Sequence, residues 1–101
     1  MLFRSLASPP GCLARADEAE TAAWLGSVDL QAGRAAAALA WLDRARAAGD
    51  ARAVTAANRA AALEALGRVA EARAAWGEVA SQAGASPLGA RAAERLRHLP
   101  R

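Results

Sequence analysis

The chain has 101 residues, a net charge of +3 and a composition that is 54% hydrophobic, much of it alanine. This length fits one small domain, and a core rich in alanine buries little apolar area per residue, so we expect modest stability or a stabilising partner. The thirteen basic residues are all arginine and are interleaved with ten acids, which disfavours a nucleic-acid-binding domain with one basic face.

The N-terminal residues 1–16 differ in composition from the rest of the chain. They contain Arg4, Arg15 and two serines but no acid, and a Pro-Pro-Gly turn precedes Cys12, which we place outside the packed core. Cys12 is the only cysteine, so an internal disulfide is excluded. We predict a flexible segment, with an organelle-targeting sequence as the alternative. Otherwise, since no apolar run is long enough to span a membrane, we expect the chain in the cytoplasm.

Four glycines interrupt the rest of the chain at nearly equal intervals, each after a run rich in alanine or leucine: Gly33, Gly49, Gly67 and Gly84. Glycine is favoured just past a helix end because it adopts a positive φ without a Cβ clash. The four stops predict five helices, over about residues 17–32, 34–48, 51–66, 68–82 and 87–99. No segment alternates like a strand, and the short links favour antiparallel neighbours, so the predicted fold class is all-α.

The first predicted helix opens on acidic residues, which suit the positive end of a helix dipole: Asp17, Glu18 and Glu20. Its apolar side carries Trp24 and Val28, while Leu25 competes with Trp24 for the buried position. The spacing of all three tryptophans favours core positions over ligand stacking.

The later helices carry clearer start signals. Asp50 is a suitable N-cap for the third helix, and Ser86 for the fifth, where Pro87 takes the first helical position. Gly77 and Gly89 fall inside predicted helices, where a glycine costs about 1 kcal/mol relative to alanine.

The second and fourth predicted helices superpose when the sequence is shifted by one repeat. The shift places the Gly33-Arg34 step on Gly67-Arg68 and Leu42 on Trp76. A helix–turn–helix unit with a period of about 34 residues is typical of the tetratricopeptide repeat. The stretches "LGSVDLQAGRAAAALAWLDRA" and "ANRAAALEALGRVAEARAAWGEV" resemble two such repeats, and "SPLGARAAERLRHL" resembles the single helix that closes an array.

This resemblance implies antiparallel helix hairpins stacked as a short α-solenoid over residues 17–99. In such stacks Ala38 and Ala72 would allow close helix approach, while Leu42 and Trp76 would fill the gaps between neighbouring hairpins. The sequence departs from the family at its usual first-helix tryptophan, where Ala22 or Ala56 stands.

In tetratricopeptide arrays the first helices of successive repeats line a concave groove that holds a peptide. Carried onto this chain, the groove candidates are Glu20, Ser27, Gln31, Asn58, Ala61, Glu64, Arg91, Arg95 and His98. The last three share a face of the final helix, where arginine's planar donor fork could grip an acidic segment or a C-terminal carboxylate. The alternative for this stripe is an ordinary solvated face.

Catalysis has little support in the sequence. His98 is the only histidine and is far in sequence from Cys12, and neither metal-ligand spacing nor a phosphate-binding loop occurs. We therefore predict a non-catalytic protein–protein interaction module without metal or cofactor, whose partner is a protein or peptide. The alternatives are a structural or self-associating segment of a larger assembly, and a helical module associated with a transcription regulator.

Overall fold

The computed structural model describes the backbone of residues 12–100 and the side chains of residues 17–100. It contains five helices: α2 (Cys12–Gln31), α3 (Ala35–Ala47), α4 (Ala53–Ala65), α5 (Val69–Ala83) and α6 (Pro87–His98). No strand occurs between residues 12 and 100, so the predicted all-α class is confirmed. Of the predicted flexible segment, residues 1–11 lie outside the described residues.

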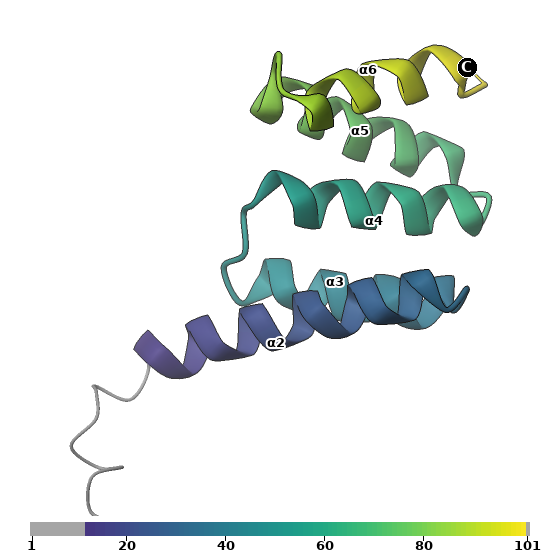
Figure 1. Ribbon diagram of the computed structural model, residues 1–101. Helices are drawn as coiled ribbons and strands as arrows, with labels where there is room; N and C mark the ends of the chain where they lie inside the picture. The colour runs from purple at the N-terminus through teal and green to yellow at the C-terminus, as the bar shows by residue number, and fades with distance from the viewer. Residues whose placement is uncertain (1–11, 101) are drawn as a thin grey trace, which may run out of the picture.

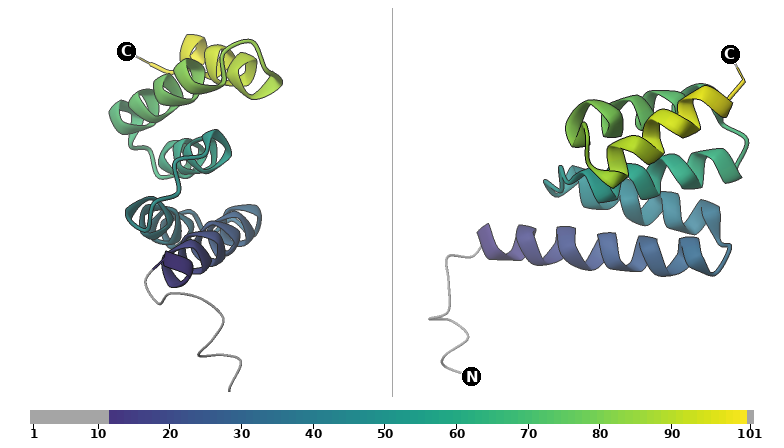
Figure 2. Two further views of the ribbon diagram at one scale, coloured as in Figure 1. Left: turned by 90° about the vertical axis from the view of Figure 1, so that its left-hand side faces the viewer. Right: turned by 45° about the horizontal axis from the view of Figure 1, so that its top comes forward.

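The five helices form a helical-repeat-like stack in which each runs antiparallel to the one before it (Figure 1). Each helix packs against its neighbours in the chain, and α4 additionally contacts α2 and α6. Seen nearly end-on, α2, α4 and α6 lie on one side of the stack, and α3 and α5 lie on the other (Figure 2). Side chains of α2, α4 and α6 therefore share one side of the molecule.

The predicted glycine stops end the helices as expected. All four have positive φ, for example +83° at Gly33 and +77° at Gly67. At the end of α4, the Gly67 N–H donates to the Glu64 carbonyl at 2.9 Å, and the Arg68 N–H donates to the Leu63 carbonyl at 2.9 Å. This pair of bonds satisfies carbonyls that the helix end leaves without partners, and the same pattern follows Gly33.

Two predicted helix starts are wrong. Helix α2 begins at Cys12, so this residue is helical and the acids from Asp17 onward lie inside the helix, not in its first turn. Helix α4 begins at Ala53 with Arg52 as its N-cap residue, so Asp50 does not occupy the cap position. The prediction for α6 is confirmed, since the Ser86 hydroxyl oxygen accepts a hydrogen bond from the Gly89 N–H at 3.2 Å.

Small residues let the helices approach closely, as predicted. Ala38 and Ala72 are fully buried, and so is Leu42, while Trp76 is 1% exposed. A Cβ placed on Gly26 of α2 would lie 2.6 Å from the Leu42 Cγ atom, so no larger residue fits there without rearrangement. Leucine and tryptophan therefore fill the space that alanine and glycine leave open.

The prediction that all three tryptophans are core residues is wrong for one of them. Trp76 is buried and Trp41 is half-buried, but Trp24 is 63% exposed. Its neighbour Leu25 is half-buried, which matches the expected competition for the inner position. An exposed tryptophan on a small domain is a candidate contact residue.

Candidate functional site

A depression of about 300 Å³ opens between α2 and α4 on the side shared by α2, α4 and α6. We call it the α2–α4 depression; it is lined by Glu20, Ala23, Trp24, Ser27, Arg52, Val54, Thr55 and Asn58. The structure thus brings together three predicted groove residues, Glu20, Ser27 and Asn58, from two helices.

Apolar side chains are unusually accessible at this depression. Trp24 is 63% exposed and Val54 is 49% exposed, and they come from the two helices that flank it. Beside them, Ser27 donates its hydroxyl proton to the Trp24 carbonyl at 2.9 Å, so its oxygen remains available as an acceptor. The depression combines apolar surface with a few polar groups, as binding sites for peptide side chains do.

Two further groove candidates pair with each other. Glu64 of α4 accepts hydrogen bonds from the Arg95 guanidinium of α6, with Nε at 3.2 Å, and also from the Trp76 indole N–H. The hydrogen bonds from Arg95 hold the pKa of Glu64 below its ordinary value, although partial burial opposes this. The network connects α4, α5 and α6. Glu64 neutralises the charge of Arg95, which the sequence predicts to bind an acidic ligand.

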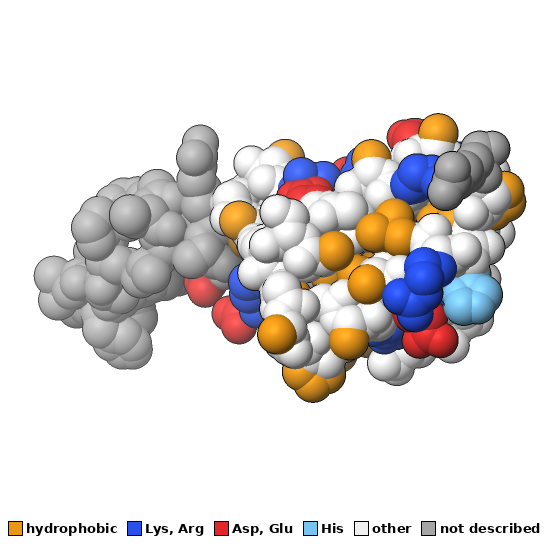
Figure 3. Space-filling model, turned by 90° about the horizontal axis from the view of Figure 1, so that it is seen from above, with side chains coloured by type: hydrophobic (Ala, Val, Ile, Leu, Met, Phe, Trp, Pro, Cys, Tyr) orange, Lys and Arg blue, Asp and Glu red, His pale blue; other side chains and the backbone are white. Residues whose placement is uncertain are grey.

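The other two basic candidates, Arg91 and His98, belong to α6 as well. The Arg91 guanidinium lies 5.8 Å from the centroid of the Trp76 ring, within the range of a cation–π contact. His98 Nδ1 lies 2.8 Å from the Glu94 carbonyl oxygen, one helical turn earlier. Seen from above, the histidine lies at one end of this face with arginine and acidic side chains beside it (Figure 3).

The remaining two candidates fall outside the α2–α4 depression. Ala61 is half-buried and packs against the hydrophobic core, so it can contribute only a shallow surface between α4 and its neighbours. Gln31 is exposed at the last residue of α2. The predicted groove residues therefore form two groups, one at the depression and one around Glu64, rather than one continuous row.

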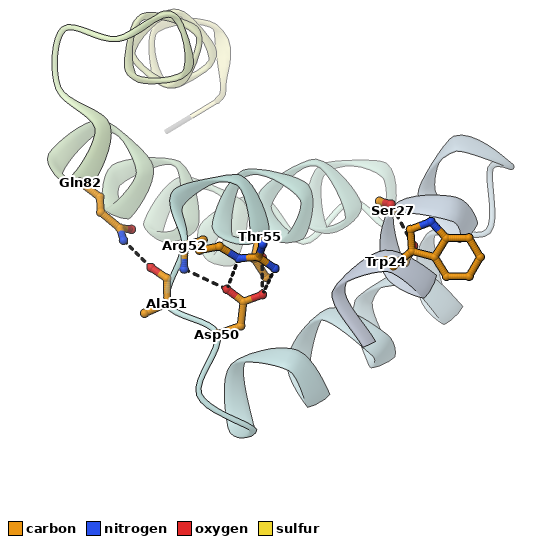
Figure 4. A network of polar contacts seen from close by, with 7 residues as sticks. All are labelled: Trp24, Ser27, Asp50, Ala51, Arg52, Thr55 and Gln82. Atoms are coloured by element: carbon orange, nitrogen blue, oxygen red, sulfur yellow. Dashed lines mark hydrogen bonds and ion pairs between the residues drawn. The ribbon is translucent and has the colours of Figure 1, made fainter. Parts of the chain in front are cut away.

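The buried carboxylate of Asp50 organises the loop between α3 and α4. From the sequence, Asp50 is expected to be a helix N-cap. Asp50, in the loop between α3 and α4, accepts hydrogen bonds from the Arg52 N–H at 3.0 Å, from the Arg52 guanidinium at 2.7 and 3.0 Å, and from the Thr55 hydroxyl at 2.8 Å (Figure 4). The hydrogen bonds from Arg52 lower the pKa of Asp50 to about 2, against the opposing effect of burial. This network borders the α2–α4 depression and holds its α4 wall.

The described residues contain no group of three potential ligands close enough together to hold a metal ion. Between residues 12 and 100, no helix combines the length and the apolar character needed to cross a membrane. Comparisons with protein-family models, with curated proteins and with solved structures find no match for this chain.

Proposed function

We propose that this chain is a helical-repeat module of the tetratricopeptide type that binds a peptide or protein segment without catalysis. The α2–α4 depression is the observation that supports this function most strongly. It lies on the side shared by α2, α4 and α6, where tetratricopeptide modules hold their ligands, and it exposes Trp24 and Val54 next to Glu20 and Asn58. Large apolar side chains beside polar groups are typical of contact sites for peptides.

The arginines give little support to nucleic-acid binding. Seven of those with described side chains form ion pairs with Asp or Glu. A nucleic-acid interface needs a basic surface that is not neutralised by neighbouring acids. A helical module associated with a transcription regulator would therefore act through protein contacts.

Peptide binding is tested with a random peptide library displayed on phage and selected on the immobilised full chain. We expect selected peptides to bind, and Ser27→Arg to weaken them about tenfold or more because the added side chain fills the depression. Ala36→Arg, a change of similar size and charge at an exposed position of α3, is the matched control and should leave binding unchanged. The proposal is wrong if no peptide is enriched, or if both variants bind equally poorly while remaining helical.

The ligand's charge is tested on α6. Because Arg95 is paired with Glu64, the informative change is Arg91→Glu alone, with Arg97→Glu as the matched control on the same helix. If the ligand is acidic, Arg91→Glu weakens the selected peptides severalfold and Arg97→Glu does not. Equal effects of the two changes would show that Arg91 only contributes to the overall charge.

A further inference from the structure

Trp24 and Glu20 form one wall of the α2–α4 depression. They are four residues apart on α2, so their side chains lie one helical turn apart on the same side of this helix. Both line the depression and both are exposed, Trp24 to 63%. One ligand group can therefore contact the indole ring and the carboxylate at the same time.

The other two tryptophans each carry an arginine of this chain. The Arg44 guanidinium lies 5.1 Å from the centroid of the Trp41 ring and pairs with Glu18 at 3.3 Å. The Trp76 ring carries Arg91 in the same way. Both contacts place a positive charge over the electron-rich face of an indole ring.

Trp24 has a carboxylate beside it but no such cation. Between residues 17 and 100, no arginine lies over the Trp24 ring and no ion pair involves Glu20. The arginine that lines the depression, Arg52, donates its guanidinium hydrogen bonds to Asp50 instead. These hydrogen bonds raise the pKa of Arg52 and Glu20 adds a smaller electrostatic contribution, so Glu20 lies near Arg52 without pairing with it.

The charge of α2 has one sign along its described side chains. Residues 17–31 carry four charged groups, all of them acidic: Asp17, Glu18, Glu20 and Asp29. Glu18 and Asp29 have arginine partners, whereas Asp17 and Glu20 have none among the side chains that the structure describes. The wall that α2 contributes to the depression therefore attracts positive charge.

We propose that the α2–α4 depression binds a basic peptide segment, and that an arginine of this segment lies on the Trp24 ring with its guanidinium beside the Glu20 carboxylate. This inference rests on the proposed peptide binding and specifies the chemistry of the ligand. A guanidinium is planar, stacks on aromatic rings and donates hydrogen bonds to carboxylates. Asn58 lines the depression from α4, where its amide oxygen can accept a hydrogen bond from the same segment.

An acidic segment fits this depression less well. A carboxylate placed on Trp24 would meet the negative charge of Glu20 and the electron-rich face of the ring. Arg95, from which the sequence predicts an acidic ligand, lies on α6, does not line the depression and is neutralised by Glu64. Charge complementarity at the depression thus favours a basic ligand.

The test uses three synthetic nonapeptide mixtures, in which the central residue is arginine, glutamine or glutamate and all other positions are uncharged. Each mixture competes for the full chain with a fluorescent phage-selected peptide whose binding Ser27→Arg weakens, and fluorescence anisotropy follows the displacement. We expect the arginine mixture to bind about three- to tenfold more tightly than the glutamine mixture, and the glutamate mixture to bind most weakly.

The outcomes separate this inference from the proposed function. Equal displacement by the arginine and glutamine mixtures, or a preference for glutamate, overturns the basic ligand while peptide binding itself stands. If the phage selection enriches no peptide, both proposals fail.

Two variants locate the arginine preference on the protein. Glu20→Gln and Trp24→Leu should each reduce the ratio of arginine to glutamine affinity about two- to fivefold, because one removes the ion pair and the other removes the ring. Glu94→Gln, the same change at an exposed carboxylate of α6, is the matched control and should leave this ratio unchanged. If Glu94→Gln reduces the ratio as much as Glu20→Gln does, the preference reflects the net charge of the chain and the arginine does not bind at Trp24. Circular dichroism checks that all three variants stay helical.

Discussion

Gly26 and Gly77 both interrupt alanine-rich helices, but their surroundings differ. A Cβ on Gly26 would lie 2.6 Å from the buried Leu42 Cγ atom, whereas a Cβ on Gly77 would meet no atom within 4 Å. We expect Gly77→Ala to stabilise the fold by about 1 kcal/mol through helix propensity. Gly26→Ala should destabilise it by about 1–2 kcal/mol, because overpacking outweighs the same gain. Urea denaturation followed by circular dichroism measures both, and equal effects would contradict this difference in packing.

A local sequence pattern predicts the burial of a single residue correctly only where neighbouring helices cover the apolar side of its helix. The burial of Ala38 and Trp76 is predicted correctly because both sides of their helices meet a partner. The prediction fails for Trp24 because the core side of α2 is taken by small residues such as Ala22, so the apolar stripe faces outward. The sequence holds two signals for this exposure: Leu25 competes with Trp24 for the inner position, and the polar Asn58 stands at the position equivalent to Trp24 in the next repeat.

Helix ends are predicted more accurately than helix starts. A positive-φ glycine is required by the backbone itself, so Gly33 and Gly67 mark real ends. Asp50 has the right chemistry for an N-cap, but its carboxylate bonds to Arg52 and Thr55 from outside the helix. Tertiary burial decides its role, and no local rule contains that information.

The stop at Gly67 provides a test of how much one helix end contributes. Its φ of +77° lies in the left-handed region, where a Cβ clashes with the backbone. We expect Gly67→Ala to lower the free energy of unfolding by about 1–2 kcal/mol, although it fills open space. Gly77→Ala is the matched control, because the same chemical change in a helix interior has the opposite sign. If both variants are stabilised in thermal denaturation, α4 does not depend on this turn.

Across the whole molecule, long-range polar contacts connect elements that the sequence shows only as separate helices. Glu64 of α4 pairs with Arg95 of α6, and Asp43 and Arg59 join α3 to α4. The repeat period predicts where the helices end. The repeat period does not predict which acid pairs with which arginine, because each carboxylate has several arginines on neighbouring helices to choose from. The charges of the groove candidates can therefore be listed from the sequence, but not which of them neutralise each other.

The buried Asp50 network and the partly buried Glu64 network make the stability of the whole stack depend on pH. Arg52 lowers the pKa of Asp50 to about 2, and Arg95 lowers that of Glu64. A carboxyl group with a lowered folded-state pKa stabilises the fold above its unfolded pKa of about 4, and this contribution is lost as the pH falls through the folded value. From Asp50 alone we expect the free energy of unfolding to fall by roughly 2 kcal/mol between about pH 4 and pH 2. Urea denaturation at a series of pH values measures this loss.

Two variants assign the acid-sensitive part of this stability. Asp50→Asn should be less stable at neutral pH and should lose less stability on acidification, because the amide keeps its protonation state while the Arg52 contacts weaken. Glu71→Gln, which removes an exposed ion pair with Arg68, should retain the full acid dependence, since pairs of this kind contribute little. If Asp50→Asn shows the same loss between about pH 4 and pH 2 as the unmodified chain, then Asp50 does not control it. The acid sensitivity of the stack would then have to come from the Glu64 network between α4 and α6.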